Sequence, residues 1–148
     1  MTLAADLRVA TATAKFGAVF INVGLSSCDV GVSYLLPRIV GPTRAAELML
    51  TGRHFSGEEA MAFGMLNAVA EEGTHLERAL ELAALVARQH EFGLELTKSG
   101  LHAAIDATSL RAAMELENRT QALGTFGGNF TEAMAAFVEK RPPEWKPM

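Results

Sequence analysis

The sequence predicts a mostly helical α+β fold. Three observations support this prediction: helical patterns dominate from Val32 onward, three segments begin with capping-box spacing, and only two short runs are strand-like. The chain has 148 residues, of which 49% are apolar and 20% charged. These values are ordinary for a globular domain that buries a core.

The first strand-like run is Ala4 to Thr13, which contains Val9 and two threonines. Nothing before it in the sequence can pair with it, and a lone strand does not form a sheet. This suggests that an N-terminal part of the fold is missing. Met65 to Ala70 is the second strand-like run.

Proline and glycine divide the region around residue 40. Pro37 interrupts the apolar run Ser33 to Ile39 and biases Leu36 away from helical dihedral angles. Gly41-Pro42 restarts the chain, with Pro42 suited to a first helical position. The spacing then predicts a helix from Thr43 to Leu50 that stops at Gly52, and Arg53-His54 is expected on a surface turn.

Later helices are predicted from their capping residues and their apolar periodicity. In a capping box, the first side chain accepts from a free backbone N–H and the Glu three residues later reaches back. The three pairs with this spacing are Ser56/Glu59, Thr74/Glu77 and Asn129/Glu132. The predicted helices run from Ser56 to Gly64, Thr74 to about Gln89, Phe92 to Ile105, Ser109 to Leu123 and Thr131 to Lys140.

Composition argues against several classes of protein. The net charge of −4 provides no basic surface for nucleic acid. No apolar run reaches membrane-spanning length, and Met1 to Ala14 lacks the pattern of a signal peptide. Cys28 is the one cysteine, which favours a reducing, cytoplasmic setting. The four histidines show no metal-ligand spacing, so no metal site is predicted.

Lys15 to Arg38 is the segment with the most chemical content. It holds one carboxylate, Asp29, between Gly24 and Gly31 in otherwise apolar surroundings. A charge placed there must be solvated, paired or used. Asp29 is therefore a candidate acid or base, and equally a candidate N-cap for the run that follows.

Two neighbours of Asp29 carry weaker signals. Cys28 could be a nucleophile, but a buried, inert thiol is the favoured interpretation because no histidine lies nearby in the sequence. Ser27 could donate a hydrogen bond to a substrate, and Ser26 likewise. Serines in such positions are more often turn residues.

A series of motifs in fixed order resembles the C-terminal half of the enoyl-CoA hydratase/isomerase (crotonase) family. Each motif is weak alone, but the ordered series covers nearly the whole chain. In order, the motifs are ADLRVA from Ala5, AKFG from Ala14, NVGL from Asn22, LPRIVG from Leu36, AELMLTGR from Ala46, EEA from Glu58, GMLN from Gly64 and AAFVEKRP from Ala135.

The resemblance implies a partial crotonase-like fold that binds acyl-CoA. In that family two backbone N–H groups stabilise the thioester oxyanion, and carboxylates move protons or activate water. The two segments that supply those N–H groups are not found in this sequence. Residues 1–70 are expected to be the C-terminal part of the core, and residues 71–148 a helical region for CoA contact and trimerisation.

The resemblance also assigns candidate pocket residues. Phe20 stands where many members carry a catalytic Glu, and phenylalanine cannot transfer a proton. Asp29 resembles a proton-shuttling Asp of the dienoyl-CoA isomerases, after a one-residue insertion. Isomerisation is thus easier to support than hydration. Phe20, Leu25 and Ser27 are the expected substrate-pocket residues, with Phe20 also readable as a core aromatic.

C-terminal aromatic and basic residues are the candidates for CoA contact. The resemblance points to Phe137, Lys140 and Trp145. The alternatives are that Phe137 packs in the core beside Val138 and that Lys140 belongs to a solvated face.

The expected function is hydration (a lyase reaction) or double-bond isomerisation of an enoyl-CoA, as in fatty acid metabolism, and we expect this function to be impaired in this chain alone. CoA would enter as part of the substrate, with no separate cofactor, and the expected assembly is a homotrimer or hexamer. The alternative is a non-catalytic remnant that acts as a helical assembly or binding domain.

Overall fold

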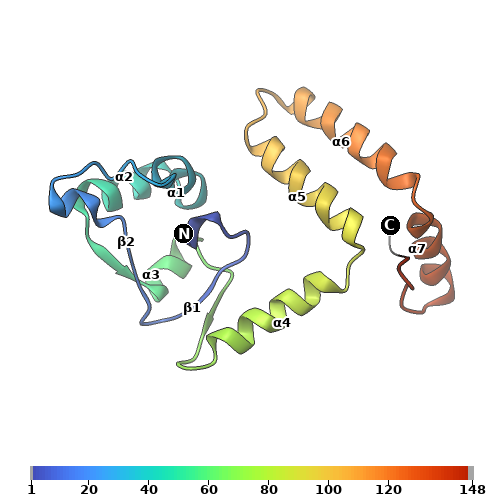
Figure 1. The fold of residues 1–148 in the computed structure, drawn as a ribbon, viewed down its shortest axis with the longest axis horizontal. Helices are drawn as coiled ribbons and strands as arrows, with labels where there is room; N and C mark the ends of the chain where they lie inside the picture. Colours follow the sequence, from blue (N-terminus) through green and yellow to red (C-terminus); the bar gives the residue numbers. More distant parts are fainter. Residues whose placement is uncertain (1, 147–148) are drawn as a thin grey trace. The chain divides into compact units, whose positions relative to one another are not determined.

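The computed structural model describes residues 2–146, which fall into two compact units, Met1–Leu82 and Ala83–Met148 (Figure 1). Each unit is described by itself. The expected functional division after residue 70 is a separate matter and stays a prediction.

Short strands, 3-10 turns and helices alternate in the first unit. In chain order they are η1 (Thr2–Ala4), β1 (Val9–Thr11), β2 (Lys15–Gly17), η2 (Val19–Val23), α1 (Val32–Val40), α2 (Pro42–Thr51), β3 (His54–Ser56), α3 (Gly57–Ala62) and β4 (Ala68–Ala70). The helix α4 (His75–Ala87) begins in this unit and ends in the second.

The strands of the first unit pair in two ladders. β1 is parallel to β4, with Val9 opposite Ala68, and β2 is antiparallel to β3, with Phe16 opposite Phe55. The expectation that the first strand lacks a partner is therefore wrong, because its partner β4 lies downstream. β2 and β3 were not predicted, since three residues give no readable alternation.

Asn67 extends the β1–β4 ladder to Arg8. Its side-chain oxygen accepts the Arg8 N–H at 2.8 Å, and its own N–H donates to the Arg8 carbonyl at 2.8 Å. The Arg8 guanidinium donates to the Met65 carbonyl at 2.7 Å. The turn that precedes β1 is thereby fixed to the turn that precedes β4.

Pro37 lies inside α1 and does not interrupt it, contrary to the sequence-based expectation. Its missing N–H leaves the carbonyl of Ser33 without its usual helical partner. Leu36, directly before it, is buried in the core. We infer that the burial of this apolar face outweighs the local preference of the residue before proline.

The predicted helix boundaries around α2 and α3 are confirmed. Pro42 begins α2, and Gly52 caps its end in the left-handed conformation with φ of 60°. At α3 the Ser56 hydroxyl accepts the Glu59 N–H at 3.1 Å, and the Glu59 carboxylate accepts the Ser56 N–H at 3.0 Å. This is the complete capping box.

The hydrophobic core of the first unit lies between α1, α2, β3 and α3. Leu48 of α2 is fully buried at its centre. The Phe55 ring lies 5.6 Å from Phe16, where β2 pairs with β3, and 5.9 Å from Phe63. The remaining buried members are Leu36, Ala45, Ala60, Met65 and Leu66.

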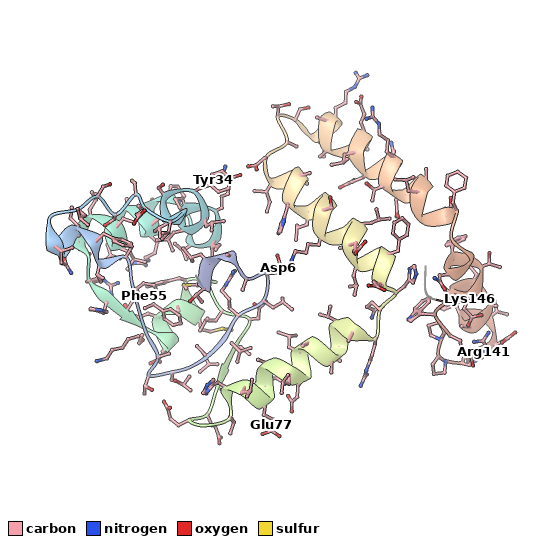
Figure 2. The ribbon with its side chains drawn as sticks, viewed as in Figure 1. Asp6, Tyr34, Phe55, Glu77, Arg141 and Lys146 are labelled. Atoms are coloured by element: carbon pink, nitrogen blue, oxygen red, sulfur yellow. The ribbon has the colours of Figure 1, made fainter. Side chains whose placement is uncertain are left out.

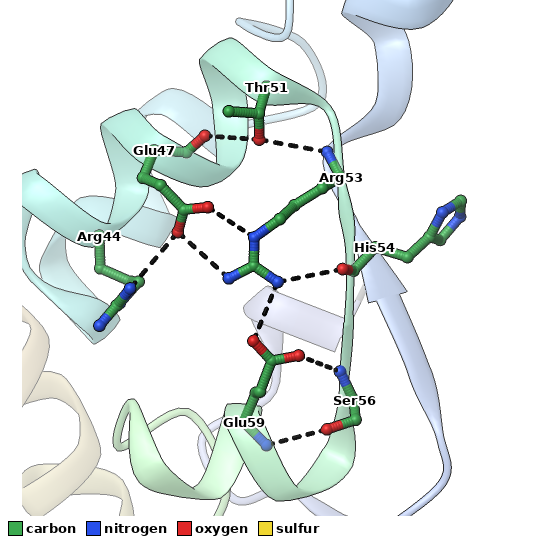
Figure 3. A network of polar contacts seen from close by, with 7 residues as sticks. All are labelled: Arg44, Glu47, Thr51, Arg53, His54, Ser56 and Glu59. Carbon is green, nitrogen blue, oxygen red and sulfur yellow. Dashed lines mark hydrogen bonds and ion pairs between the residues drawn. The ribbon is translucent and has the colours of Figure 1, made fainter.

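Arg53 joins α2 to α3 through a polar network, rather than lying free on a surface turn (Figure 3). Its guanidinium donates to Glu47 at 2.5 Å and to Glu59 at 2.9 Å. The hydrogen bond from Arg53 lowers the pKa of Glu47. The pKa of Glu59 is lowered first by the Ser56 N–H and then by Arg53. Arg44 is a further partner of Glu47 at 3.5 Å.

The second unit is helical in its described part, with α5 (Glu91–Ile105), α6 (Leu110–Thr125) and α7 (Gly128–Glu139) following the end of α4. α5 and α6 form an antiparallel hairpin (Figure 1). Ser109 caps α6 by accepting the Ala112 N–H at 3.2 Å. Ala136 is the buried apolar residue here among those described, while large apolar side chains such as Phe126 and Phe137 are exposed.

Two of the three predicted capping boxes are not what the structure shows. The Thr74 hydroxyl donates to the Glu71 carbonyl at 3.1 Å, a turn contact before α4. Gly127, and not Asn129, is the N-cap of α7. Asn129 lies within the helix and is buried. Its side chain bonds to the backbone of Lys146 instead of capping the helix.

Across residues 2–146, none of the helices combines the length and the apolar character needed to span a bilayer.

Replacement of Leu48 by alanine is expected to lower the free energy of unfolding by about 2–5 kcal/mol, since it opens a cavity in the core. The matched control is Leu50→Ala in the same helix, where the side chain is 77% exposed. The control should change stability by less than about 0.5 kcal/mol. Denaturant unfolding followed by far-ultraviolet circular dichroism measures both, and equal losses would contradict this placement of the core.

Candidate functional site

The candidate site is the segment between β2 and α1, which leaves the sheet at Gly17 and enters the helix at Val32. η2 makes one 3-10 turn and ends at Gly24, whose φ is 78°. The Gly24 N–H donates to the Ile21 carbonyl at 3.1 Å and the Leu25 N–H to the Phe20 carbonyl at 3.1 Å. The chain then runs through Ser27 and Asp29.

The C-terminal end of α2 holds this segment in place. The Asn22 side chain donates to the Gly52 carbonyl at 2.8 Å. The Ser27 hydroxyl lies 2.9 Å from the Met49 carbonyl and 3.2 Å from the Ala18 carbonyl. A Cβ on Gly52 would overlap Asn22 and Ile21, and its φ of 60° also favours glycine.

Ser27 is 6% exposed, and its hydroxyl is directed at backbone carbonyls. A hydroxyl has one proton, so it donates to one of these carbonyls at a time. Ser27 is therefore observed in a structural contact, and its predicted role in a substrate pocket stays a prediction. Ser26 makes a turn contact by accepting the Cys28 N–H at 3.0 Å.

Asp29 is exposed to solvent at the turn that leads into α1. Its carboxylate accepts the N–H of Val30 at 2.8 Å, and its carbonyl accepts the N–H of Val32 at 2.8 Å. Gly31, with φ of 83°, is the N-cap of α1. The N-cap alternative for Asp29 is thus wrong, because the left-handed Gly31 comes between Asp29 and the helix.

Val30 has a φ of 42°, in the left-handed region. This conformation costs a β-branched residue about 1–2 kcal/mol. The side chain is 72% exposed, so burial does not compensate for the strain. Backbone strain of this kind is concentrated at functional sites, where surrounding contacts hold an otherwise unfavourable turn.

The other candidates in this segment differ in exposure. Phe20 is half-buried in η2, and Leu25 is exposed. Cys28 is exposed, which contradicts the favoured interpretation as a buried thiol. Within this turn Ser27 is buried, whereas Leu25, Cys28 and Asp29 are exposed.

A cavity of about 120 Å³, lined mostly by apolar residues, lies next to both ends of this segment. Ala18 borders it where the segment begins, and Val32 and Leu36 where it ends. Phe16 and Phe55 line it from the paired strands β2 and β3. Sequence reasoning missed this cavity, because its aromatic lining depends on a strand pair too short to predict.

The predicted CoA-contact residues all belong to the second unit. Phe137 is 81% exposed, so the interpretation of Phe137 as a core residue is wrong. Lys140 is exposed and ends α7 in the left-handed conformation. The Trp145 indole N–H donates to the Arg88 carbonyl at 2.7 Å. Contact of these residues with CoA stays a prediction.

Glu132 anchors the chain that follows α7, of which Arg141 and Lys146 are labelled in Figure 2. Its carboxylate accepts two hydrogen bonds from the Arg141 guanidinium, at 2.6 and 3.2 Å, and the Glu144 N–H at 2.8 Å. Hydrogen bonding to Arg141, then to the Glu144 N–H, lowers the pKa of Glu132 to about 2. The pKa of Arg141 is raised by the same contact and by Glu139.

Comparison with known proteins places this geometry in a family. The sequence profile of the enoyl-CoA hydratase/isomerase family matches residues 1–147. A Mycobacterium tuberculosis protein named as a probable enoyl-CoA hydratase is 43% identical over 144 residues, which are 97% of this chain and 50% of that protein. The 1,2-epoxyphenylacetyl-CoA isomerase of Escherichia coli is 34% identical over 145 residues, 98% of this chain and 55% of that protein.

The fold agrees with the sequence match. A crystal structure of a probable enoyl-CoA hydratase/isomerase from Mycobacterium abscessus matches with a TM-score of 0.90 at 39% identity, over 97% of this chain and 56% of that one. The fold is thus a partial, mostly helical α+β fold of the crotonase type. The chain belongs to the enoyl-CoA hydratase/isomerase family.

The chain spans about half the length of the curated relatives it matches. This coverage agrees with the expected correspondence to the C-terminal half of a family member.

Glycine in place of Val30 is expected to raise the free energy of unfolding by about 0.5–1 kcal/mol. The relief of left-handed strain exceeds the entropic cost of a glycine. The control is Val23→Gly, an exposed valine in the right-handed η2 turn, which should be destabilising. Urea unfolding of both variants tests this, and a loss of stability in Val30→Gly would show that the turn is not strained.

Stability should fall as the pH is lowered from about 4.5 toward 2, partly through Glu132. The pKa of Glu132 is lower in the folded chain than its ordinary value of 4.5, so its contribution is complete above pH 4.5 and lost as the pH approaches 2. Glu132→Gln should be less stable than the wild type at pH 6 and should approach it at low pH. Unfolding curves at several pH values test this, and a constant difference between the two proteins would contradict it.

Proposed function

We propose that this chain is part of an acyl-CoA enzyme that shifts the double bond of an enoyl-CoA, with Asp29 as the acid/base that moves the proton. The observation that carries the proposal is the exposed carboxylate of Asp29, held in a strained turn within the segment that the sequence resemblance implies to be the active site. The proposal includes action in the cytoplasm, in fatty acid metabolism.

The chemistry requires a base that reaches the carbon next to a thioester. Removal of that proton gives an enolate, and return of the proton at the far end of the allylic system completes the isomerisation. One carboxylate can perform both transfers, first as base and then as acid. Water is not consumed, so a second carboxylate is not needed.

Hydration is supported less well by the residues present. It needs a group that activates water, and Phe20 stands where many relatives carry a Glu for that purpose. The aromatic ring offers neither a proton nor an acceptor for one. Cys28, which is exposed beside Asp29, is a weaker nucleophile candidate because no basic partner is observed among its described contacts.

Several contacts support a positioning role for the residues around Asp29. Ser27 and Asn22 tie the segment to the end of α2, so the turn begins from a fixed point. The Val30 N–H fixes one carboxylate oxygen of Asp29, which leaves the other for a substrate. Most of the residues that line the cavity beside Ala18 and Val32 are apolar, which suits an acyl chain.

CoA contact and assembly form the second part of the proposal. We assign the CoA end of the substrate to Phe137, Lys140 and Trp145, where aromatic and cationic groups lie close together in the sequence. A homotrimer or hexamer would cover the exposed apolar residues of the second unit, such as Phe126 and Val138.

The enzymatic proposal is tested with a short 3-enoyl-CoA, by following the absorbance of the conjugated thioester that isomerisation produces. Asp29→Asn should lower the rate about 10²- to 10⁴-fold, the range for loss of a general acid/base. Cys28→Ser, at the neighbouring exposed position, should leave the rate close to that of the wild type. Equal rates for wild type and Asp29→Asn would remove Asp29 from the mechanism.

A non-catalytic assembly or binding domain is the second candidate function. The extensive apolar exposure of α6 and α7 favours it, since such patches mark interfaces. The coding DNA upstream of Met1 separates the two candidates. An in-frame extension that encodes a glycine-rich turn would support the enzyme, and a stop codon directly upstream would support the assembly domain.

A further inference from the structure

We propose that His90 and Asn129 form a pH-sensitive latch that holds the segment Arg141–Lys146, named here the C-terminal strap. The latch is closed when the His90 imidazole is neutral and opens when the imidazole gains a proton. All of its parts belong to the second unit. The inference does not rest on the proposed function.

The orientation of the Asn129 carboxamide is fixed by the strap. Its oxygen accepts the Lys146 N–H at 2.8 Å, and its nitrogen donates to the Lys146 carbonyl at 2.9 Å. A flipped amide would place an acceptor against a carbonyl and a donor against an N–H. Asn129 is buried, so these bonds are partly shielded from bulk water.

The second hydrogen of the Asn129 amide nitrogen is directed at Nε2 of His90. Because an amide nitrogen only donates, Nε2 must accept, and the neutral ring carries its proton on Nδ1. A proton added to Nε2 would turn this contact into two facing N–H groups. The imidazolium therefore cannot keep the contact that the neutral ring makes.

His90 also supports the tryptophan of the strap. The Trp145 ring centroid lies 5.7 Å from that of His90, with 42° between the planes, while the indole N–H donates to the Arg88 carbonyl. The Phe92 ring also lies edge-on to His90, with 6.4 Å between the ring centroids. Attraction between an imidazolium and the indole offsets part of the lost hydrogen bond, but the tilt weakens it.

Charged groups of both signs lie on the elements around His90. Among them are Arg88 after α4, Glu91 in α5, Glu132 in α7, and Glu144 and Lys146 in the strap. Glu132 is engaged by Arg141 and by the Glu144 N–H. Arg88 and Lys146 are themselves cations and disfavour a further positive charge.

The strap thus has two anchors with different acid sensitivity. The Glu132 anchor at Arg141 and Glu144 persists until the pH is far below 4.5, because the pKa of Glu132 is lowered. The anchor at Trp145 and Lys146 depends on the neutral form of the His90 imidazole, whose Nε2 accepts from the Asn129 amide. Mild acid should release only the end of the strap that carries Trp145.

The test uses the indole N–H of Trp145, which gives a single signal because the chain has one tryptophan. Its protection against hydrogen exchange, relative to a free indole at the same pH, is measured by NMR on the full chain. Protection should fall about tenfold between pH 8 and 5, the equivalent of one net hydrogen bond. Unchanged protection at pH 5 would overturn the latch.

Two variants assign the effect to His90. His90→Gln offers an acceptor that does not titrate, so its protection should be the same at both pH values. Asn129→Asp places a carboxylate beside the imidazole, so protection should rise as the pH falls, opposite to the wild type. Equal losses in wild type and His90→Gln, or a fall in Asn129→Asp, would each show that another group controls the strap.

Discussion

The carbonyl groups at the C-terminal end of α2 are the feature on which the candidate site depends. A helix leaves its last carbonyls without partners inside the helix. In this protein the Ser27 hydroxyl and the Asn22 amide reach two of them, at Met49 and Gly52. Leu48 of the same helix, one turn before Gly52, is buried in the core. The core therefore fixes α2, and α2 fixes the segment that carries Asp29.

Elements specified by neighbouring residues could be predicted from the sequence. The Ser56/Glu59 box and the stop at Gly52 are of this kind, because every atom involved lies within a few residues. The continuation of α1 through Pro37 could not be predicted, since it depends on the core that buries Leu36. Asn129 has the sequence of a cap, but the backbone of Lys146 uses its side chain instead. Both the course of α1 and the role of Asn129 therefore depend on contacts between residues that are far apart in the sequence.

The segment that carries Asp29 was predicted from the sequence as a candidate site, but its geometry was not predicted. Asp29 was a candidate acid or base because it is the one carboxylate in a segment with several glycines. The ordered motifs indicated the family that the comparisons confirm. The strain at Val30 could not be predicted from the residue type, because valine rarely adopts the left-handed conformation that Val30 has in this structure. The exposure of Cys28 and Phe137 was also missed, since apolar character alone does not state which surface a side chain faces.

The uneven distribution of buried apolar residues has a thermodynamic consequence. The heat capacity change of unfolding follows the apolar surface that unfolding exposes. In the described chain nearly all of the fully buried apolar side chains belong to the first unit, whereas Ala136 alone represents the second. The isolated chain should therefore unfold with a smaller heat capacity change than its length suggests, and with a shallow dependence on denaturant. Its stability curve would be broad and flat, governed by the part of the chain that contains α2.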